Sequence, residues 1–241
     1  MGDHLKRYVA PESWGIARKV NTFVIKPSPG PHNANAMPIA VWLRDHMGLA
    51  RNMKEVRQIL QQRDVIVNGR PCRHPSMGIG IFDIISIPKT GRFYRILRDK
   101  KGRHKTIEID ESASMSRLVK IVNKTIVPGG KVQLNLRDGT NIIADNTYMT
   151  HDSVVLSLKE GDNNKVIDHF PYLEGNMAMV IGGKHSGVVA RIKEIIAVPG
   201  SVPNRVLLTN ESDGSTFETI DEYVVMVGRE KPALESWGIE E

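Results

Sequence analysis

Residues 52–70 read NMKEVRQILQQRDVIVNGR, and this stretch decides the fold of the first part of the chain. Asn52 is a favoured helix N-cap, and apolar residues recur behind it at helical spacing. The apolar stripe comprises Met53, Val56, Ile59 and Leu60. Residues 65–67 are β-branched and run into Asn68-Gly69, a dipeptide that favours a hairpin because both residues tolerate a positive φ. The stretch therefore predicts a helix, a strand and a hairpin turn.

The opposite face of this helix is polar and basic. It carries Lys54, Arg57, Gln58, Gln61 and Gln62. Side chains three and four positions apart lie close together on a helix, so Lys54, Arg57 and Gln61 form one patch. Arg51 stands at the helix entrance, where free backbone N–H groups favour phosphate. Further cations at Arg63, Arg70 and Arg73 extend the patch through the strand and the following loop.

A second helix is predicted just before this stretch. Pro38 suits a first helical turn, and Gly48 is placed to end the helix. The apolar side chains between them are Ile39, Trp42, Leu43 and Met47. Residues 82–87 predict a further strand, so residues 38–88 are expected to form one compact module of helices followed by strands.

The remaining segments differ in composition. Residues 1–37 are basic and proline-rich around Pro27–Pro31, and they are expected to form an extended arm that lies on another surface. Residues 89–170 and 171–241 carry short alternating stretches separated by turn residues, which predict two mostly-β domains. The predicted strands span residues 106–109, 132–137, 141–143, 154–158, 176–181, 188–195, 205–209 and 223–227.

Charge is distributed unevenly along the chain. Residues 1–105 hold 20 Lys and Arg against 7 Asp and Glu, a net charge of +13, whereas residues 106–241 hold 13 against 20, a net charge of −7. Within the basic half, residues 89–105 form a long cationic run that Phe93 and Tyr94 interrupt. Guanidinium groups bind phosphate and aromatic rings stack on unpaired bases, so this half predicts nucleic-acid binding.

Several classes of protein are disfavoured. The single cysteine, Cys72, permits no internal disulfide and no cysteine-based metal site, and Cys72-Arg73-His74 is interpreted as an unreactive loop. Residues 182–186 fail the phosphate-loop pattern, because Ala178 and His185 stand where glycine and a hydroxyl residue are required. No apolar run reaches the ~20 residues of a membrane span, and no signal peptide is visible. We therefore expect no catalytic residues, metal, cofactor or small-molecule substrate.

The sequence resembles a known family along most of its length. Residues 42–88 are similar to the S-four RNA-binding module, and residues 176–187, NMAMVIGGKHSG, resemble a KOW motif. His4-Leu5-Lys6-Arg7, residues 10–14 and residues 27–32 look like the amino-terminal arm of the small-subunit ribosomal proteins of family four, archaeal and eukaryotic "e" type. The order of arm, S-four module, central β domain and KOW domain is specific to that family.

The resemblance implies an α+β, multi-domain fold. It divides the chain into a basic arm (1–37), the S-four module (38–88), a central β domain (89–170) and an SH3-like KOW barrel with a carboxy-terminal tail (171–241). It also implies RNA contacts in the module, the arm and the KOW turn. The predicted RNA-binding residues are His4, Lys6, Arg7, His32, Arg51, Lys54, Arg57, Gln61, Arg63, Arg70, Arg73, Lys184 and His185. Gly187 is expected to serve backbone geometry.

The implied function is that of a structural constituent of the small ribosomal subunit in the cytoplasm. Its partners would be ribosomal RNA and neighbouring ribosomal proteins. Two alternatives stay open: an RNA-modifying enzyme of pseudouridine-synthase type with an appended S-four module, and a KOW-containing transcription or translation factor. An enzyme would need a convergent acid, base or nucleophile, and a factor would wash off ribosomes in moderate salt.

Overall fold

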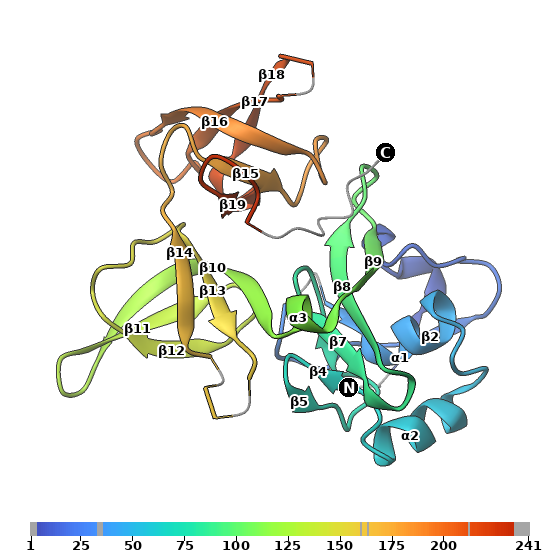
Figure 1. The fold of residues 1–241 in the computed structure, drawn as a ribbon. Coiled ribbons are helices and arrows are strands. Elements are labelled where there is room, and N and C mark those ends of the chain that lie inside the picture. The colour runs from blue at the N-terminus through green and yellow to red at the C-terminus, as the bar shows by residue number, and fades with distance from the viewer. Residues whose placement is uncertain (1–3, 33–35, 160, 163, 212, 234–241) are drawn as a thin grey trace. The chain divides into compact units, whose positions relative to one another are not determined.

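The computed structural model describes the chain except for residues 1–3, 33–35, 160, 163, 212 and 234–241. The chain divides into two compact units. As far as their residues are described, the first comprises Met1–Leu97, Arg103–Arg117 and Leu158–Gly161, and the second comprises the rest. The described α-helices all belong to the first unit, and the second is built from β-sheet (Figure 1). This agrees with the predicted α+β, multi-domain fold. The predicted tail around Trp237 lies outside the described residues.

The first unit contains a five-stranded sheet (Figure 1). In spatial order its strands are β5 (Arg70–Pro71), β4 (Ile66–Val67), β7 (Ile84–Ile87), β8 (Arg92–Arg98) and β9 (His104–Ile109). The β4–β5 hairpin turns at Asn68 and Gly69, whose φ angles are 50° and 75°. The hairpin predicted from the Asn-Gly dipeptide is therefore confirmed.

Both predicted helices of residues 38–88 are present. The first begins as α1 (Ile39–Val41) and continues as the wider turn η4 (Trp42–His46), and Gly48 follows in the left-handed region with a φ of 65°. The second is α2 (Met53–Gln61). The side chain of Asn52 caps α2 as expected, because its Oδ1 accepts a hydrogen bond from the backbone N–H of Glu55 at 3.0 Å.

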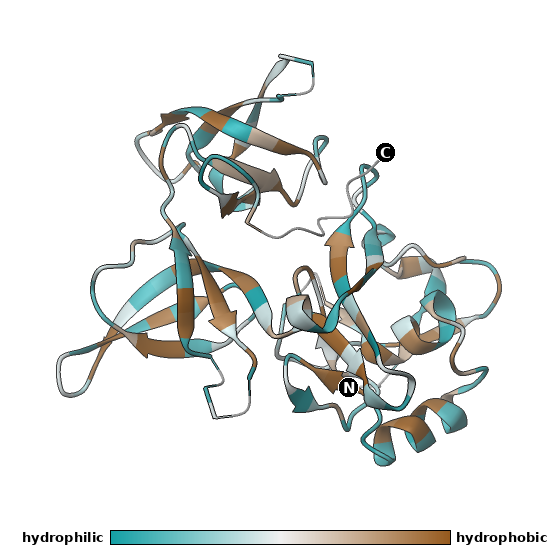
Figure 2. Ribbon diagram, in the orientation of Figure 1, coloured by the Kyte–Doolittle hydropathy of each residue, from teal (hydrophilic) through white to brown (hydrophobic). Residues whose placement is uncertain are grey.

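The core of the first unit forms between these helices and the sheet. Val56 and Leu60 of α2 are completely buried, together with Trp42. Figure 2 shows hydrophobic and hydrophilic segments alternating along α2, as expected for a helix with one buried face. The indole N–H of Trp42 donates to the hydroxyl of Thr106 on β9 at 2.9 Å. The remaining elements of this unit are the strand pair β3 (Met37–Pro38) and β6 (Gly78–Ile79), and the turns η5 (Pro88–Thr90) and α3 (Glu111–Ser114).

The amino-terminal arm folds onto this core. It contains β1 (His4–Lys6), η1 (Arg7–Val9), η2 (Glu12–Trp14) and β2 (Phe23–Ile25), with β1 and β2 antiparallel. Trp14 is 1% exposed, and its indole N–H donates to the carbonyl of Ala36 at 3.0 Å. The surface on which the arm lies is therefore the chain's own module. Burial of Trp14 and Val24 supplies the apolar contact that composition alone does not indicate.

The cationic run at residues 89–105 is not a continuous surface. Residues 92–98 form β8 between two other strands, and Tyr94 is 4% exposed with its ring edge-on to Trp42, 5.6 Å between centroids. Phe93 packs against a separate cluster around Ile84. The Tyr94 ring is therefore not accessible to an RNA base, whereas Phe93 is half-buried.

The second unit contains another five-stranded sheet (Figure 1). Its strands, in spatial order, are β12 (Asn141–Ala144), β11 (Lys131–Leu136), β10 (Ser116–Val127), β13 (Ser153–Ser157) and β14 (Val166–Phe170). Leu134, Val154 and Leu156 lie in its apolar core. A register shift between Ile121 and Asn123 interrupts the pairing of β10 with β11.

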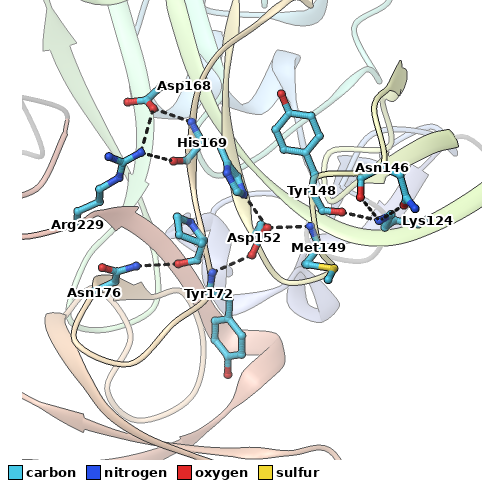
Figure 3. A network of polar contacts seen from close by, with 11 residues as sticks. Lys124, Asn146, Tyr148, Met149, Asp152, Asp168, His169, Tyr172, Asn176 and Arg229 are labelled. Carbon is cyan, nitrogen blue, oxygen red and sulfur yellow. Dashed lines mark hydrogen bonds and ion pairs between the residues drawn. The ribbon is translucent and has the colours of Figure 1, made fainter.

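A buried carboxylate fixes the loops beside β13 and β14 (Figure 3). Asp152 is 3% exposed and accepts hydrogen bonds from the backbone N–H groups of Met149 and Tyr172, each at 2.8 Å. Its Oδ2 also lies 2.6 Å from Nε2 of His169 on β14. These three contacts give the buried Asp152 carboxylate a structural role.

The last sheet of the second unit also has five antiparallel strands. In spatial order they are β18 (Thr216–Ile220), β17 (Arg205–Thr209), β16 (Val189–Ile196), β15 (Met177–Val180) and β19 (Val224–Gly228), with η6 (Asp221–Tyr223) before β19.

Lys120 of β10 joins the two sheets of this unit. Its ammonium donates to the carbonyls of Asp221 at 2.6 Å and Val224 at 2.8 Å.

Candidate nucleic-acid interface

The exposed face of α2 is the centre of the candidate interface. Lys54, Arg57 and Gln61 are all exposed, while Val56 and Leu60 of the same helix are buried in the core. The buried stripe fixes the rotation of the helix about its axis, so the polar face points to solvent. Within the described part of the chain, no acidic side chain forms an ion pair with Lys54 or Arg57. The face thus presents two cations and an amide to an incoming anion.

The entrance of α2 differs from the prediction. Glu55 reaches back over the first turn, where its carboxylate accepts hydrogen bonds from the backbone N–H of Arg51 at 2.7 Å and from the Asn52 amide at 2.9 Å. The helix entrance is therefore a closed capping arrangement that places a negative charge where we predicted a phosphate seat. The side chain of Arg51 stays exposed and remains a candidate for RNA contact.

Three further cations follow α2. Arg63, Arg70 and Arg73 are exposed, and Arg63 adopts a φ of 58° as the chain leaves the helix. Arg70 lies on β5, directly paired with Val67 of β4 across the tight turn. The buried pairing of β4 with β7 anchors this hairpin, so Arg70 is presented on a rigid element.

Two of the predicted contacts from the arm are used within the chain. Arg7 is 2% exposed, and its guanidinium donates to the carbonyl of Ala17 at 2.6 Å and to Asp45 at 2.9 Å. The His32 side chain is 8% exposed and bonds Asp83 at 2.8 Å. This contact, with hydrogen bonds from Asn68 and Gly80, lowers the pKa of Asp83 against the opposing effect of burial. Neither side chain offers its charged group to a partner, so we omit both from the proposed interface.

His4 and Lys6, in contrast, are exposed on β1. The arm also exposes two rings that sequence reasoning missed, Tyr8 at 72% and Phe23 at 51%. Successive side chains of a strand face opposite sides, so Phe23 points away from the core that buries Val24. This strand alternation is the sequence signal that could have revealed the exposed Phe23 ring.

The two predicted residues of the second unit lie in the loop between β15 and β16. Lys184 is exposed, and the ring of His185 stacks on that of Phe217 with 4.3 Å between centroids. Gly187 adopts a φ of 81°, and a Cβ there would lie 3.0 Å from the carbonyl oxygens of Arg98 and Asp99. The prediction that Gly187 serves backbone geometry is confirmed.

The described residues show neither a reactive thiol nor a group of metal ligands. Burial raises the pKa of the Cys72 thiol to about 11, so the thiolate is scarce at neutral pH. Among the described residues, no three histidine, cysteine or acidic side chains are grouped to hold a metal ion. No described helix has the length and apolar character needed to cross a membrane.

A capped helix with a buried stripe and a cationic face, followed by a tight hairpin, defines a protein that contains an S4 domain. The S4 domain model matches residues 37–85, the RS4NT domain model matches residues 1–35, and the model of Ribosomal family S4e matches residues 90–163. The three matches follow one another along the chain.

Relatives match over the full length. A small ribosomal subunit protein eS4 of Methanospirillum hungatei is 70% identical over all 241 residues of both chains. That of Archaeoglobus fulgidus is 43% identical over 96% of this chain and 97% of its own. The crystal structure of 30S ribosomal protein S4e from Thermoplasma acidophilum superposes with a TM-score of 0.68 and 26% identity, covering 81% of this chain and 96% of that one. The chain belongs to the S4e family of ribosomal proteins.

Proposed function

We propose that this protein is a structural constituent of the small ribosomal subunit that binds ribosomal RNA and supports translation. The observation that carries the proposal is the exposed cationic face of α2, continued by Arg63, Arg70 and Arg73, on an S4 domain. The full-length similarity to proteins named eS4 supports the same role. The work of such a protein is binding, and the buried, weakly acidic Cys72 thiol offers no nucleophile.

The mechanism is neutralisation of phosphates where RNA strands come close together. Guanidinium groups donate two parallel hydrogen bonds to a phosphate, which fixes geometry as well as charge. Arg57 and Arg70 are held on a helix and a hairpin, so little backbone freedom is lost on binding. Each neutralised phosphate releases counterions, and this release drives association.

The proposed contacts are the exposed residues among the sequence predictions, together with the half-buried His185. They comprise His4, Lys6, Arg51, Lys54, Arg57, Gln61, Arg63, Arg70, Arg73, Lys184 and His185. We further propose the division into an arm (1–37), an S4 module (38–88), a central β domain (89–170) and a KOW domain of SH3-like barrel type (171–241). The five antiparallel strands β15–β19 support the last assignment.

The proposed location is the ribosome, in the cytoplasm, with small-subunit ribosomal RNA and neighbouring ribosomal proteins as partners. The second unit carries much of the acidic half of the chain, where residues 106–241 have a net charge of −7. The second unit as a whole has a net charge of −3, against +9 for the first unit, so protein neighbours fit it better than a broad RNA contact does.

Incorporation into small subunits tests the proposal. The variant R57E/R63E/R70E reverses three exposed charges of the interface, and the control K131E/K165E/K193E reverses three exposed lysines of the second unit. Both change the net charge equally. During reconstitution with small-subunit RNA and the other subunit proteins, we expect the interface variant to incorporate about tenfold less than the wild type, because three charge-assisted contacts are lost.

We expect the control variant to incorporate like the wild type. An equal loss in both variants would show that total charge, and not this surface, governs assembly. Full incorporation of the interface variant would refute the proposal.

A further inference from the structure

The outward face of the β1–β2 hairpin carries exposed aromatic rings. Phe23 is 51% exposed on β2, and Tyr8 is 72% exposed on η1, which follows β1 directly. The ring of His4 meets that of Phe23 edge-on, with 4.8 Å between centroids and 76° between planes. An edge-on neighbour holds the Phe23 ring in place without covering its face.

The hairpin presents these rings on a fixed base. Leu5 and Val24 form a directly opposed pair on the other face, where Val24 is 3% exposed and Leu5 packs against the core. The buried Arg7 guanidinium, bonded to Ala17 and Asp45, anchors η1. Rings on such a base lose little freedom when a ligand covers them, which favours binding.

The surroundings of the rings are cationic. Lys6 is paired with Phe23 across the two strands, and Lys19 and Lys26 are also exposed. Residues 1–32 hold five Lys and Arg against two acidic residues, of which Glu12 bonds Arg18 at 3.4 Å. An apolar protein partner would need no cation beside the aromatic side chains, whereas a polyanion that carries flat apolar groups fits both the rings and Lys6.

We propose that Phe23, with Tyr8 and His4, is a stacking surface for unpaired bases of RNA, and that Lys6 binds the adjoining phosphate. This inference rests on the proposed function and adds to it a second mode of RNA recognition. The cationic face of α2 contacts phosphates of any RNA strand, whereas the aromatic face requires bases that are not paired. Every base has a π-face, so the surface selects single strands without selecting sequence.

The test compares rings with aliphatic side chains of similar bulk in the full-length protein. The double variant Y8L/F23L keeps apolar side chains but removes both rings, and Y8F/F23Y keeps both rings. Binding is measured against a single-stranded oligoadenylate of about 12 nucleotides and a blunt RNA duplex of about the same length. Val20→Ala, at another exposed aliphatic position of the arm, is the local control.

We expect Y8L/F23L to bind oligoadenylate about tenfold or more weakly than the wild type, since stacking contributes ~1–3 kcal/mol per base. Its affinity for the duplex, and both affinities of Y8F/F23Y and Val20→Ala, should stay within about twofold, because phosphate contacts remain. Unchanged oligoadenylate binding by Y8L/F23L would overturn the inference. So would an equal loss on the duplex, or an equal loss in Y8F/F23Y.

The two proposals fail in different ways. If R57E/R63E/R70E bound ribosomal RNA normally, the proposed function would fall, while the contrast between rings and aliphatic side chains would still be measurable. If that contrast were absent while R57E/R63E/R70E lost RNA binding, only the stacking surface would fall.

Discussion

Arg57 and Arg95 are both arginines of the first unit, yet they have opposite environments. Arg57 is exposed on α2, whereas Arg95 is 1% exposed on β8 and donates to the carbonyl of Ala113 at 3.0 Å. Burial lowers the pKa of Arg95 to about 10. Lys120 of the second unit is similarly enclosed. These residues add to the net charge of the sequence but hold the fold together, so the cationic surface is smaller than composition indicates.

Lys120 makes stability depend on pH. Burial, together with the nearby charge of Arg137, lowers its pKa from 10.5 to about 7. Between these values the unfolded chain binds one more proton than the folded chain, so the free energy of unfolding rises with pH. We expect a rise from pH 7 to 9 of up to about 1.4 kcal/mol per pH unit from this group. Urea unfolding at several pH values measures it.

The raised pKa of Cys72 limits this rise in the free energy of unfolding to pH values below about 9. Above about pH 9 the unfolded thiol ionises and the folded one does not, so its contribution cancels that of Lys120 and stability levels off. Lys120→Met should remove the rise, and Lys131→Met, at an exposed position, should keep it. A rise of the same size in Lys120→Met would mean that another group causes it.

At the scale of elements, α2 depends on its first turn. The Asn52 side chain caps the helix while Glu55 bonds back to Arg51 and Asn52, so three residues hold the turn that begins the cationic face. Helix ends that lose such partners fray, and fraying would disorder Lys54 first.

We expect Asn52→Ala to lower the free energy of unfolding of the first unit by about 1 kcal/mol, because one N–H donor loses its acceptor. Asn52→Ser retains an acceptor oxygen and should cost only a few tenths of a kcal/mol. Urea unfolding followed by tryptophan fluorescence is the measurement, since Trp14 and Trp42 are both buried in this unit's core. Equal stability of the Ala and Ser variants would contradict the capping role.

Sequence patterns that act over a few residues predicted α2 and the β4–β5 hairpin. The strands β8 and β10 were not predicted, because they depend on contacts between residues far apart in the sequence. Asn52, the stripe at Val56 and Leu60, and the Asn68-Gly69 turn act within a few residues of one another. β8 was missed because the partner of Arg95 is a carbonyl 18 residues away, so its strand looked like a solvated run. β10 was missed because the bulge after Ile121 breaks its alternation and Lys120 stands at a buried position.

At the scale of the molecule, the uneven charge of the sequence corresponds to two units with different surfaces. The exposed members of the predicted interface lie mainly in the first unit, while Lys184 and His185 belong to the second. Sequence reasoning found the cations of α2 and the hairpin because helical period and turn chemistry determine exposure there. It did not foresee that Arg7 and His32 are buried, because their partners, Asp45 and Asp83, are distant in sequence.

The salt dependence of RNA binding tests the central claim most directly. Affinity for a small-subunit ribosomal RNA fragment is measured at several salt concentrations for the wild type, R57E/R63E/R70E and K131E/K165E/K193E. We predict that log K falls linearly with log salt concentration and that the interface variant reduces the steepness of that slope by about 3, one unit for each lost phosphate contact. The control variant should keep the wild-type slope. Identical slopes for the wild type and the interface variant would contradict the claim that this face neutralises ribosomal RNA.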